Sequence, residues 1–446
     1  MVQADFKGKK VTVVGLARSG VAAARALDAL GALVTVTDKK PLDQLTEQVR
    51  ALGSRRIVVE AGGHPDRVFL EAEIIVLSPG VPKIPQVLAA RQRGVTVISE
   101  LELAWLLSDA PYVGITGTNG KSTVTTLVGL MLERAKKKVL VAGNIGTALT
   151  EDIALLRKQD WIVAELSSFQ LEDIETFRPR VAAILNVTQD HLDRYHDINE
   201  YGEAKARIFM NQRKEDHLVL NFDDPLVKSY VKRTQATVVP FSRQLRFNPG
   251  ACVLDGYLTF NNQRVIHAGD IRIKGVHNLE NALAATALSL CAGADVQSAA
   301  AVLREFPGLE HRLEFVRERD GVAYINDSKG TNVGAVVKSV EGFEQPVILI
   351  AGGLDKGSDF SPLYELFKRK VKLLVLIGKA ANKMAEALGT STETVFAGTL
   401  QDAVRLASTK ASRGDVVLLS PACASFDMFR DFEDRGRQFK EAVMGL

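Results

Sequence analysis

One stretch, Tyr112–Thr123, restricts the possible folds of this chain more than any other. An apolar run leads into a glycine-rich turn that ends in Lys121 and Ser122, and a helical pattern follows over residues 124–135. Glycines let successive backbone N–H groups point at phosphate oxygens, and the N-terminus of the next helix adds partial positive charge. The stretch therefore predicts a strand, a phosphate-binding loop and a helix.

The loop departs from the spacing G-x-x-x-x-G-K-[ST], because Ile115 stands where the first glycine belongs. The alternative is an ordinary Gly-Thr turn with a surface lysine, which the strand before it and the helix after it disfavour. Lys121 is expected to reach the outer phosphates and the Ser122 hydroxyl to bind Mg²⁺. The candidate phosphate-binding residues are Gly117, Thr118, Asn119, Gly120, Lys121, Ser122 and Thr123.

The bulk composition is that of a globular protein of 446 residues, which is enough for two to four domains. A net charge of +3 is close to balance, so it does not suggest binding to nucleic acid or to a membrane surface. The cysteines Cys252, Cys291 and Cys423 are far apart in the sequence and include no C-x-x-C pair, which argues against a disulfide framework or a structural zinc site. No signal-peptide core and no run of about 20 apolar residues is present. We expect a soluble cytoplasmic protein with no nucleic-acid or membrane partner.

The first segment alternates short strands and helices, which predicts a parallel, Rossmann-like sheet. Its first turn, Gly15–Gly20, is an imperfect dinucleotide fingerprint, since Ala17 replaces the middle glycine. Tight packing without a ligand is the alternative. Asp38 ends the second strand, where an acidic residue often holds a ribose hydroxyl, and Ser78–Val81 closes the fourth. We expect a nucleotide-like group across these strand ends.

In the middle segment, Asn144, Glu165 and His191 follow or end predicted strands, on the same edge as the phosphate loop. A carboxylate and an imidazole there suit a second divalent ion, with Glu165 the better ligand for Mg²⁺. The alternatives are a helix N-cap or solvated rim charge for Glu165, and a hydrogen-bonded turn for His191.

Other features of the middle segment are less specific. Lys205 lies in a predicted helix over 200–212 and on pattern alone is a surface lysine. Residues 241–270 alternate short β runs with turns, which predicts a small antiparallel insert. Asn278 and Asn281 share one face of a long helix, where two amides could bind an adenine edge; capping and surface polarity is an equal alternative.

The last segment again places polar, small-residue turns after strands, which predicts a third α/β domain. The turns are 327–332, 351–356, 378–379 and 420–427. We expect domain boundaries at 1–100, 101–308 and 309–446.

Several motifs, in this order, resemble those of the Mur ligases over essentially the whole chain. They are Thr116–Ser122, Gly143–Gly146, Glu165–Gln170, Asp190–Tyr195, His277–Asn281, His311–Arg312 and Asp327–Asn332. Ser420–Asp427 is similar to the segment typical of the D-glutamate-adding members, whereas the Asp-Asn-Pro-Arg motif of the diamino-acid-adding members is absent. Gly330 stands where alanine is frequent, and Leu354-Asp355 replaces a common Asp-Gly, so the acceptor site is less well matched.

The resemblance implies three domains. They are a Rossmann-like UDP-binding domain, a P-loop ATPase central domain with a small β insert, and a Rossmann-like C-terminal domain that binds the amino acid. It also implies ATP-dependent amide formation between UDP-N-acetylmuramoyl-L-alanine and D-glutamate through an acyl phosphate. The expected cofactors are ATP and two divalent ions, Mg²⁺ or Mn²⁺. The expected state is a monomer with small-molecule substrates.

The resemblance also assigns roles to individual residues. The UDP-sugar residues would be Leu16, Ala17, Arg18, Asp38, Ser78, Gly80, Asn144 and His191. The adenosine end of ATP would lie against Asn278, Asn281, Arg312 and Asp327. D-Glutamate would be held by Lys329, Thr331, Lys356, Ser425 and Phe432. The catalytic residues would be Lys121, Glu165, His191 and Lys205, with Ser122, Glu165, His191 and a CO₂-derived carbamate on Lys205 as metal ligands.

Three other functions compete with this interpretation. A folate polyglutamate synthase shares the second and third domains but does not explain the first 100 residues. A nucleotide-binding switch or scaffold would bind ATP without releasing phosphate once both substrates are added. A dehydrogenase would not need the phosphate loop.

Overall fold

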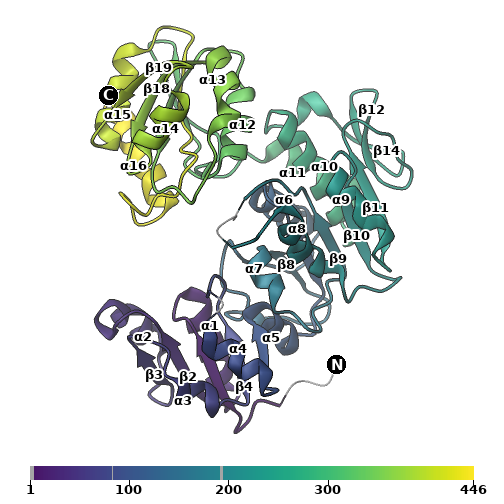
Figure 1. Cartoon of the computed structure of the whole chain (residues 1–446). Coiled ribbons are helices and arrows are strands. Elements are labelled where there is room, and N and C mark those ends of the chain that lie inside the picture. Colours follow the sequence, from purple (N-terminus) through teal and green to yellow (C-terminus); the bar gives the residue numbers. More distant parts are fainter. Residues whose placement is uncertain (1–4, 83, 191–193) are drawn as a thin grey trace. The chain divides into compact units, whose positions relative to one another are not determined.

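A computed structural model describes residues 5–446 except 83 and 191–193, and the side chain of Ala154 is also left out. The described residues form three sheets of five, nine and six strands, with helices between the strands (Figure 1). The fold is α/β with mostly parallel sheets, as the sequence predicts. The contacts divide the chain into two compact units: 1–187, 199–271 and 279–305 form the first, and 188–198, 272–278 and 306–446 form the second.

The first sheet is a parallel sheet that is buried on both faces. Its strand order is β3 (Val58–Ala61), β2 (Leu33–Asp38), β1 (Lys10–Val14), β4 (Ile74–Leu77) and β5 (Thr96–Ser99). The helices are α1 (Arg18–Ala29), α2 (Thr46–Leu52), α3 (Asp66–Leu70), α4 (Pro85–Gln92) and α5 (Glu100–Leu107). Side chains of α1, α2 and α5 cover one face, and those of α3 and α4 cover the other. This burial explains why β1 carries Val11, Val13 and Val14 on both faces, and the one buried polar side chain between them, Thr12, donates its hydroxyl to the Val68 carbonyl.

The first turn of this sheet requires glycine at one position for a packing reason. A Cβ on Gly20 would stand 1.9 Å from the Gly15 carbonyl oxygen, so helix α1 can approach strand β1 only with glycine there. The imperfect fingerprint therefore has a structural role of its own.

The second sheet carries the phosphate loop. Its order is β14 (Gln263–His267), β13 (Tyr257–Phe260), β12 (Ala251–Leu254), β11 (Thr237–Ser242), β10 (His217–Asn221), β9 (Val181–Ile184), β6 (Tyr112–Thr116), β8 (Trp161–Glu165) and β7 (Val139–Gly143). The helices are α6 (Lys121–Arg134), α7 (Ser168–Glu172), α8 (Ile198–Ala206), α9 (Pro225–Ser229), α10 (Val276–Cys291) and α11 (Val296–Glu305).

Two predictions for this region are refined by the structure. The predicted antiparallel insert forms β12, β13 and β14, but β12 pairs with β11, so the insert extends the main sheet. The helix expected over 200–212 is shorter: α8 ends at Ala206, and Arg207–Phe209 tightens into a 3₁₀ turn. Such tightening is common at helix ends.

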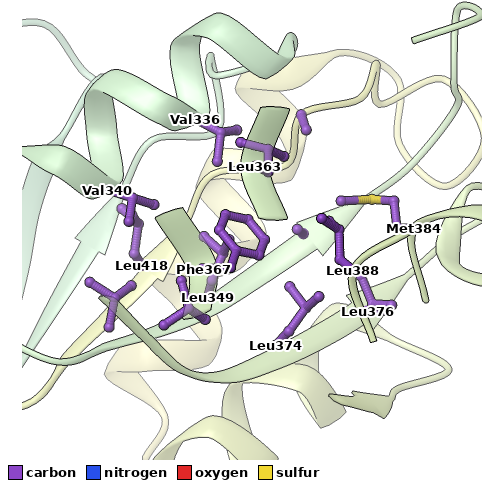
Figure 2. Packing of buried hydrophobic residues seen from close by; sticks show 14 of the residues in the cluster. Val336, Val340, Leu349, Leu363, Phe367, Leu374, Leu376, Met384, Leu388 and Leu418 are labelled. Carbon is purple, nitrogen blue, oxygen red and sulfur yellow. The ribbon is translucent and has the colours of Figure 1, made fainter. Parts of the chain in front are cut away.

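The third sheet also has helices packed on both faces. Its order is β15 (Glu314–Arg319), β16 (Val322–Asn326), β20 (Val416–Leu419), β17 (Val347–Gly352), β18 (Val371–Ile377) and β19 (Glu393–Phe396). The helices are α12 (Val333–Glu341), α13 (Tyr364–Lys370), α14 (Ala381–Leu388), α15 (Leu400–Lys410) and α16 (Phe432–Met444). Figure 2 shows the core under α12–α14, where Phe367 packs with Val340, Leu349 and Leu418. Helices α15 and α16 cover the opposite face.

None of the helices in the described part of the chain is long and apolar enough to cross a bilayer.

Candidate functional site

The predicted strand–loop–helix arrangement around the phosphate loop is confirmed. Strand β6 ends at Thr116, and α6 begins at Lys121 with Gly120 as its N-cap at φ +87°. Gly117 has φ +154°, and a Cβ on Gly120 would stand 2.4 Å from the Asn281 Oδ1. The loop therefore needs glycine at both places, and its Gly120 lies directly against Asn281, one of the two predicted adenine-binding amides.

A residue that sequence reasoning missed holds this loop in shape. The Asn186 carbonyl accepts a hydrogen bond from Thr118 N–H at 2.9 Å, and its side-chain oxygen accepts one from Asn119 N–H at 2.8 Å. Its Nδ2 donates to the Asn119 carbonyl at 3.0 Å. The available signal was its position just after β9, at the carboxyl edge of the sheet.

Two lysine side chains converge on one carbonyl of the loop. Lys121 Nζ and Lys205 Nζ each donate to the Gly117 oxygen at 2.9 Å. Lys205 is 1 % exposed, and its ammonium lies 4.1 Å from the Tyr201 ring centroid. The expectation from pattern alone, a surface lysine, is therefore wrong for Lys205. The Lys121 ammonium places positive charge where a polyphosphate would be bound.

Glu165 is a buried carboxylate at the end of strand β8, beside the loop after β7. Asn144 donates from its backbone N–H to the Glu165 carbonyl and from Nδ2 to Oε1, both at 2.9 Å. Oε2 is buried and has no hydrogen-bond partner among the described residues. Because Ser167 is the N-cap of α7 and Glu165 is 1 % exposed, both alternatives for Glu165, an N-cap and a solvated rim charge, are wrong.

The residues around Glu165 suit a divalent ion. A buried carboxylate oxygen without a partner is the donor that a hard cation prefers, and Ser122 lies in the first turn of α6, next to the loop. His191 lies outside the described residues. Within residues 5–446 without 83 and 191–193, no group of three His, Cys, Asp or Glu side chains has the arrangement of a metal site.

The predicted nucleotide-binding residues of the first sheet meet at one strand edge. Leu16 N–H donates to the Asp38 Oδ2 at 2.7 Å, and Ser78 Oγ donates to the Gly15 carbonyl at 2.9 Å. Ala17 is the exposed N-cap of α1. Gly80 has φ +84° and open space where a Cβ would point. Asp38, which was predicted to hold a ribose hydroxyl, therefore also fixes the backbone of the Gly15–Gly20 turn.

In the second unit, the loops that carry the predicted D-glutamate residues are joined by backbone hydrogen bonds. Ala422 N–H donates to the Gly330 carbonyl, and Leu354 N–H donates to the Ala424 carbonyl, both at 2.8 Å. The first bond joins the loop of Lys329 and Thr331 to the loop of Ser425. The second joins the Ser425 loop to the loop of Lys356. Lys329 Nζ lies 5.1 Å from the ring centroid of Phe432.

A second missed residue, Arg435, fastens two of these loops. Its guanidinium is fully buried and donates to the Ser328 carbonyl at 2.8 Å and to the Cys423 carbonyl at 3.2 Å. Burial lowers the pKa of Arg435 to about 10, so the group stays charged at neutral pH. No sequence signal distinguishes it, because a lone arginine in an amphipathic helix is typical of a surface position.

The predicted adenosine residues of the second unit differ in how their polar atoms are paired. Asp327 Oδ2 accepts hydrogen bonds from the Ser339 and Ser420 hydroxyls, both at 2.7 Å, and burial raises its pKa. Arg312 Nε, in contrast, is buried without a partner among the described residues. Asn278 donates from Nδ2 to the Lys274 carbonyl at 2.8 Å.

The Gly330 departure noted in the sequence has a local reason. A Cβ there would stand 2.6 Å from the Asp327 Oδ2 and 2.6 Å from the Ser420 hydroxyl. In this chain glycine fits the hydrogen-bonded carboxylate better than alanine would.

Three family models match the chain in order. The Mur ligase MurD-like N-terminal domain matches residues 9–99, the Mur ligase middle domain 115–289, and the Mur ligase glutamate ligase domain 311–423.

Curated relatives are similar over their full length. The UDP-N-acetylmuramoylalanine–D-glutamate ligase of Geotalea uraniireducens is 50% identical over 446 residues, which cover 99% of this chain and 98% of the relative. The enzyme of the same name from Geotalea daltonii is 47% identical, with 99% and 98% covered. Among solved structures, the UDP-N-acetylmuramate-alanine ligase MurC of Thermotoga maritima shares the fold, with a TM-score of 0.63, 19% identity, and 98% and 99% of the two chains covered.

Proposed function

The chain belongs to the Mur ligase family, and we propose that it joins D-glutamate to UDP-N-acetylmuramoyl-L-alanine in an ATP-driven reaction of peptidoglycan precursor synthesis. The observation that carries this proposal is the full-length identity of 50% with a relative of that name. The phosphate loop and the unpaired oxygen of Glu165 beside it support the same chemistry.

The reaction needs activation, because a carboxylate has no good leaving group. In the first step the L-alanyl carboxylate oxygen attacks the γ-phosphorus of ATP, the bond to the β,γ-bridging oxygen breaks, and ADP leaves. In the second step the D-glutamate amine attacks the acyl carbon, phosphate leaves from the tetrahedral intermediate, and the amine loses a proton. Both steps depend on alignment and charge neutralisation more than on covalent help from the protein.

The residues of the phosphate loop would do this on the ATP side. The loop N–H groups and Lys121 would hold the β- and γ-phosphates, and the Asn186 contacts keep the loop in one shape. Asn281 would lie beside them at Gly120. Asn278, Arg312 and Asp327 would contribute to binding the adenosine end of ATP.

A divalent ion fits the same edge. When bound, Mg²⁺ or Mn²⁺ would offset the mutual repulsion of the triphosphate and the carboxylate. Ser122, Glu165, His191 and a carbamate on Lys205 would be the residues that hold the two ions. The side chain of Lys205 is buried beside the phosphate loop, so a carbamate on it would lie next to the bound phosphates and ions.

The remaining residues would bind the other two substrates. Leu16, Ala17, Arg18, Asp38, Ser78, Gly80, Asn144 and His191 would hold the UDP-sugar. Lys329, Thr331, Lys356, Ser425 and Phe432 would hold D-glutamate. We also propose domain boundaries near residues 100 and 308, a monomeric state and a cytoplasmic location. The acyl phosphate is labile in water, so closure of the third domain would protect it.

The test is phosphate release by the full chain with ATP, Mg²⁺, UDP-N-acetylmuramoyl-L-alanine and a panel of amino acids. We expect release that needs all components and is fastest with D-glutamate, with L-glutamate as the matched control. Release with tetrahydrofolate in place of the UDP-sugar would indicate a folate polyglutamate synthase instead. ATP binding without any release would indicate a switch or scaffold.

A further inference from the structure

The segment Gly143–Thr150, which begins at the last residue of strand β7, is held by side chains from two helices of the first sheet. Arg18, the first residue of α1, donates to the Gly146 carbonyl at 2.6 Å and to the Gly143 carbonyl at 3.2 Å. Glu100, the first residue of α5, accepts at Oε1 from the Thr150 N–H at 2.8 Å and from its hydroxyl at 2.9 Å. The two ends of one segment are therefore fixed from outside its own sheet.

The same segment fixes Glu165. Asn144, its second residue, donates to both the backbone carbonyl and the side-chain Oε1 of Glu165 at 2.9 Å. Gly143 pairs with Glu165 in the β7–β8 ladder, and a Cβ on Gly143 would stand 2.4 Å from the Glu165 carbonyl oxygen. Because the fit is this close, a shift of the segment would turn the Glu165 carboxylate.

The buried carboxyl group of Glu100 makes an unfavourable contribution to the stability of the fold. Its carboxyl is 1 % exposed, and Oε2 has no hydrogen-bond partner among the described residues. Burial raises the pKa of Glu100 to about 7, against the Thr150 hydrogen bonds and the positive charge of Arg18, which lower it. A buried group that breaks a local rule without evident structural gain is a candidate for a functional role.

We propose that Arg18 and Glu100 are positioning residues that fix the 143–150 segment and, through Asn144, set the orientation of Glu165 toward its divalent ion. This rests on the proposed function. The proposal gives Glu100 a role. It also gives Arg18 a second role beside its predicted contact with the UDP-sugar, because Arg18 would help to orient a metal ligand.

The test compares Arg18→Gln and Thr150→Val, which removes the hydroxyl bond to the Glu100 Oε1, with a matched control, Arg25→Gln, whose exposed side chain lies on the same helix α1. We expect both test variants to need about tenfold more Mg²⁺ for half-maximal phosphate release, as loss of an outer partner of a metal ligand typically does. Arg18→Lys, which can still donate to a carbonyl, should restore part of the loss. The control should match the wild type.

A second readout needs neither metal nor turnover. Hydrogen–deuterium exchange of peptides covering 143–150 should be faster in both test variants than in the wild type and the control. Substitutions of Glu100 itself are less suitable for this test. Glu100→Ala leaves the Thr150 N–H unpaired and is expected to fold poorly, and Glu100→Gln keeps an acceptor oxygen for both bonds, whereas Thr150→Val removes only the hydroxyl bond.

Two results would overturn the proposal. One is unchanged exchange of the 143–150 peptides in both variants. The other is an unchanged Mg²⁺ dependence, with Arg18→Gln raising only the KM for the UDP-sugar, which would make Arg18 a simple substrate contact. A wild-type chain that releases no phosphate contradicts the proposed function instead, and the exchange experiment still decides whether the segment is held as described.

Discussion

Glu165 and Asp327 are both buried carboxylates at the carboxyl ends of parallel strands, but their hydrogen bonding differs. Glu165 receives one hydrogen bond at Oε1 from Asn144, and its Oε2 has no partner within the described residues. Asp327 is paired at both oxygens, with the hydroxyls of Ser339 and Ser420 at Oδ2 and a backbone N–H at Oδ1. Glu165 therefore has an oxygen available beside the phosphate loop, whereas Asp327 uses both oxygens to hold segments of the third sheet's domain together.

The difference separates two uses of a buried charge. A paired carboxylate stabilises its surroundings, and removing it strands its partners. An unpaired one destabilises the fold and persists where a ligand supplies the missing interaction. The polar groups of the phosphate-loop edge are therefore expected to matter for turnover, whereas Asp327 is expected to matter first for stability. Its contact with adenosine stays a prediction.

The largest effect is expected for Lys121→Ala, which tests whether the polar groups at the phosphate-loop edge matter for turnover rather than for stability. The variant removes the ammonium that would hold the outer phosphates, so kcat should fall by about three orders of magnitude with little change in Tm. Phosphate-release rates measure this, with Lys158→Ala as the control, since that side chain is 80% exposed. A near-normal rate would rule out the phosphate-loop assignment.

Lys205→Ala tests the second lysine at the same carbonyl. We expect about a hundredfold loss of kcat, because the proposed carbamate would be a metal ligand. Excess bicarbonate should not restore the rate, whereas short carboxylic acids should restore part of it by occupying the space of the carbamate. If the variant is fully active, the carbamate proposal is wrong.

The pair Glu165→Gln and Asp327→Ala sharpens the comparison directly. Glu165→Gln should lower the rate by about a hundredfold with Tm unchanged or raised. Asp327→Ala leaves two buried hydroxyls without their acceptor and should lower the free energy of unfolding by about 3 kcal/mol. Initial rates and thermal unfolding of both variants measure this. The comparison is wrong if Glu165→Gln mainly lowers stability and Asp327→Ala mainly lowers the rate.

Lys329→Ala tests the acceptor loops of the third sheet. Loss of a cation near the carboxylates of the amino acid should raise the KM for D-glutamate by about tenfold and leave the KM for ATP nearly unchanged. Steady-state kinetics with each substrate varied in turn measure this. An unchanged acceptor KM would argue against its role.

The smallest expected effect concerns the pH dependence of stability. Burial raises the pKa of Glu100 from 4.5 to about 7, so the folded chain binds this proton more tightly than the unfolded chain does. Its contribution to stability is therefore present below pH 4.5 and is lost as pH rises toward 7, by about 1 kcal/mol between pH 6 and 7. Glu100→Gln should lack this slope in chemical unfolding, whereas Glu305→Gln, an exposed position, should keep it.

The sequence alone determined which local structures form and where polar groups stand along the chain. The glycines and lysine of residues 117–121 predicted strand, loop and helix, and strands that end in polar turns predicted three α/β sheets. These features depend on neighbours in the chain, on backbone conformation and on apolar periodicity, which a sequence displays directly.

Only the tertiary structure decided which polar side chains are buried and what they contact. Lys205 looked like a surface lysine and is buried. Asn186 showed only its position after a strand, and Arg435 showed no signal at all, yet both hold loops of the candidate sites in place. Arg18 and Gly146 lie 128 positions apart. Such contacts depend on how distant segments pack, and nothing in the local pattern of either partner specifies the other.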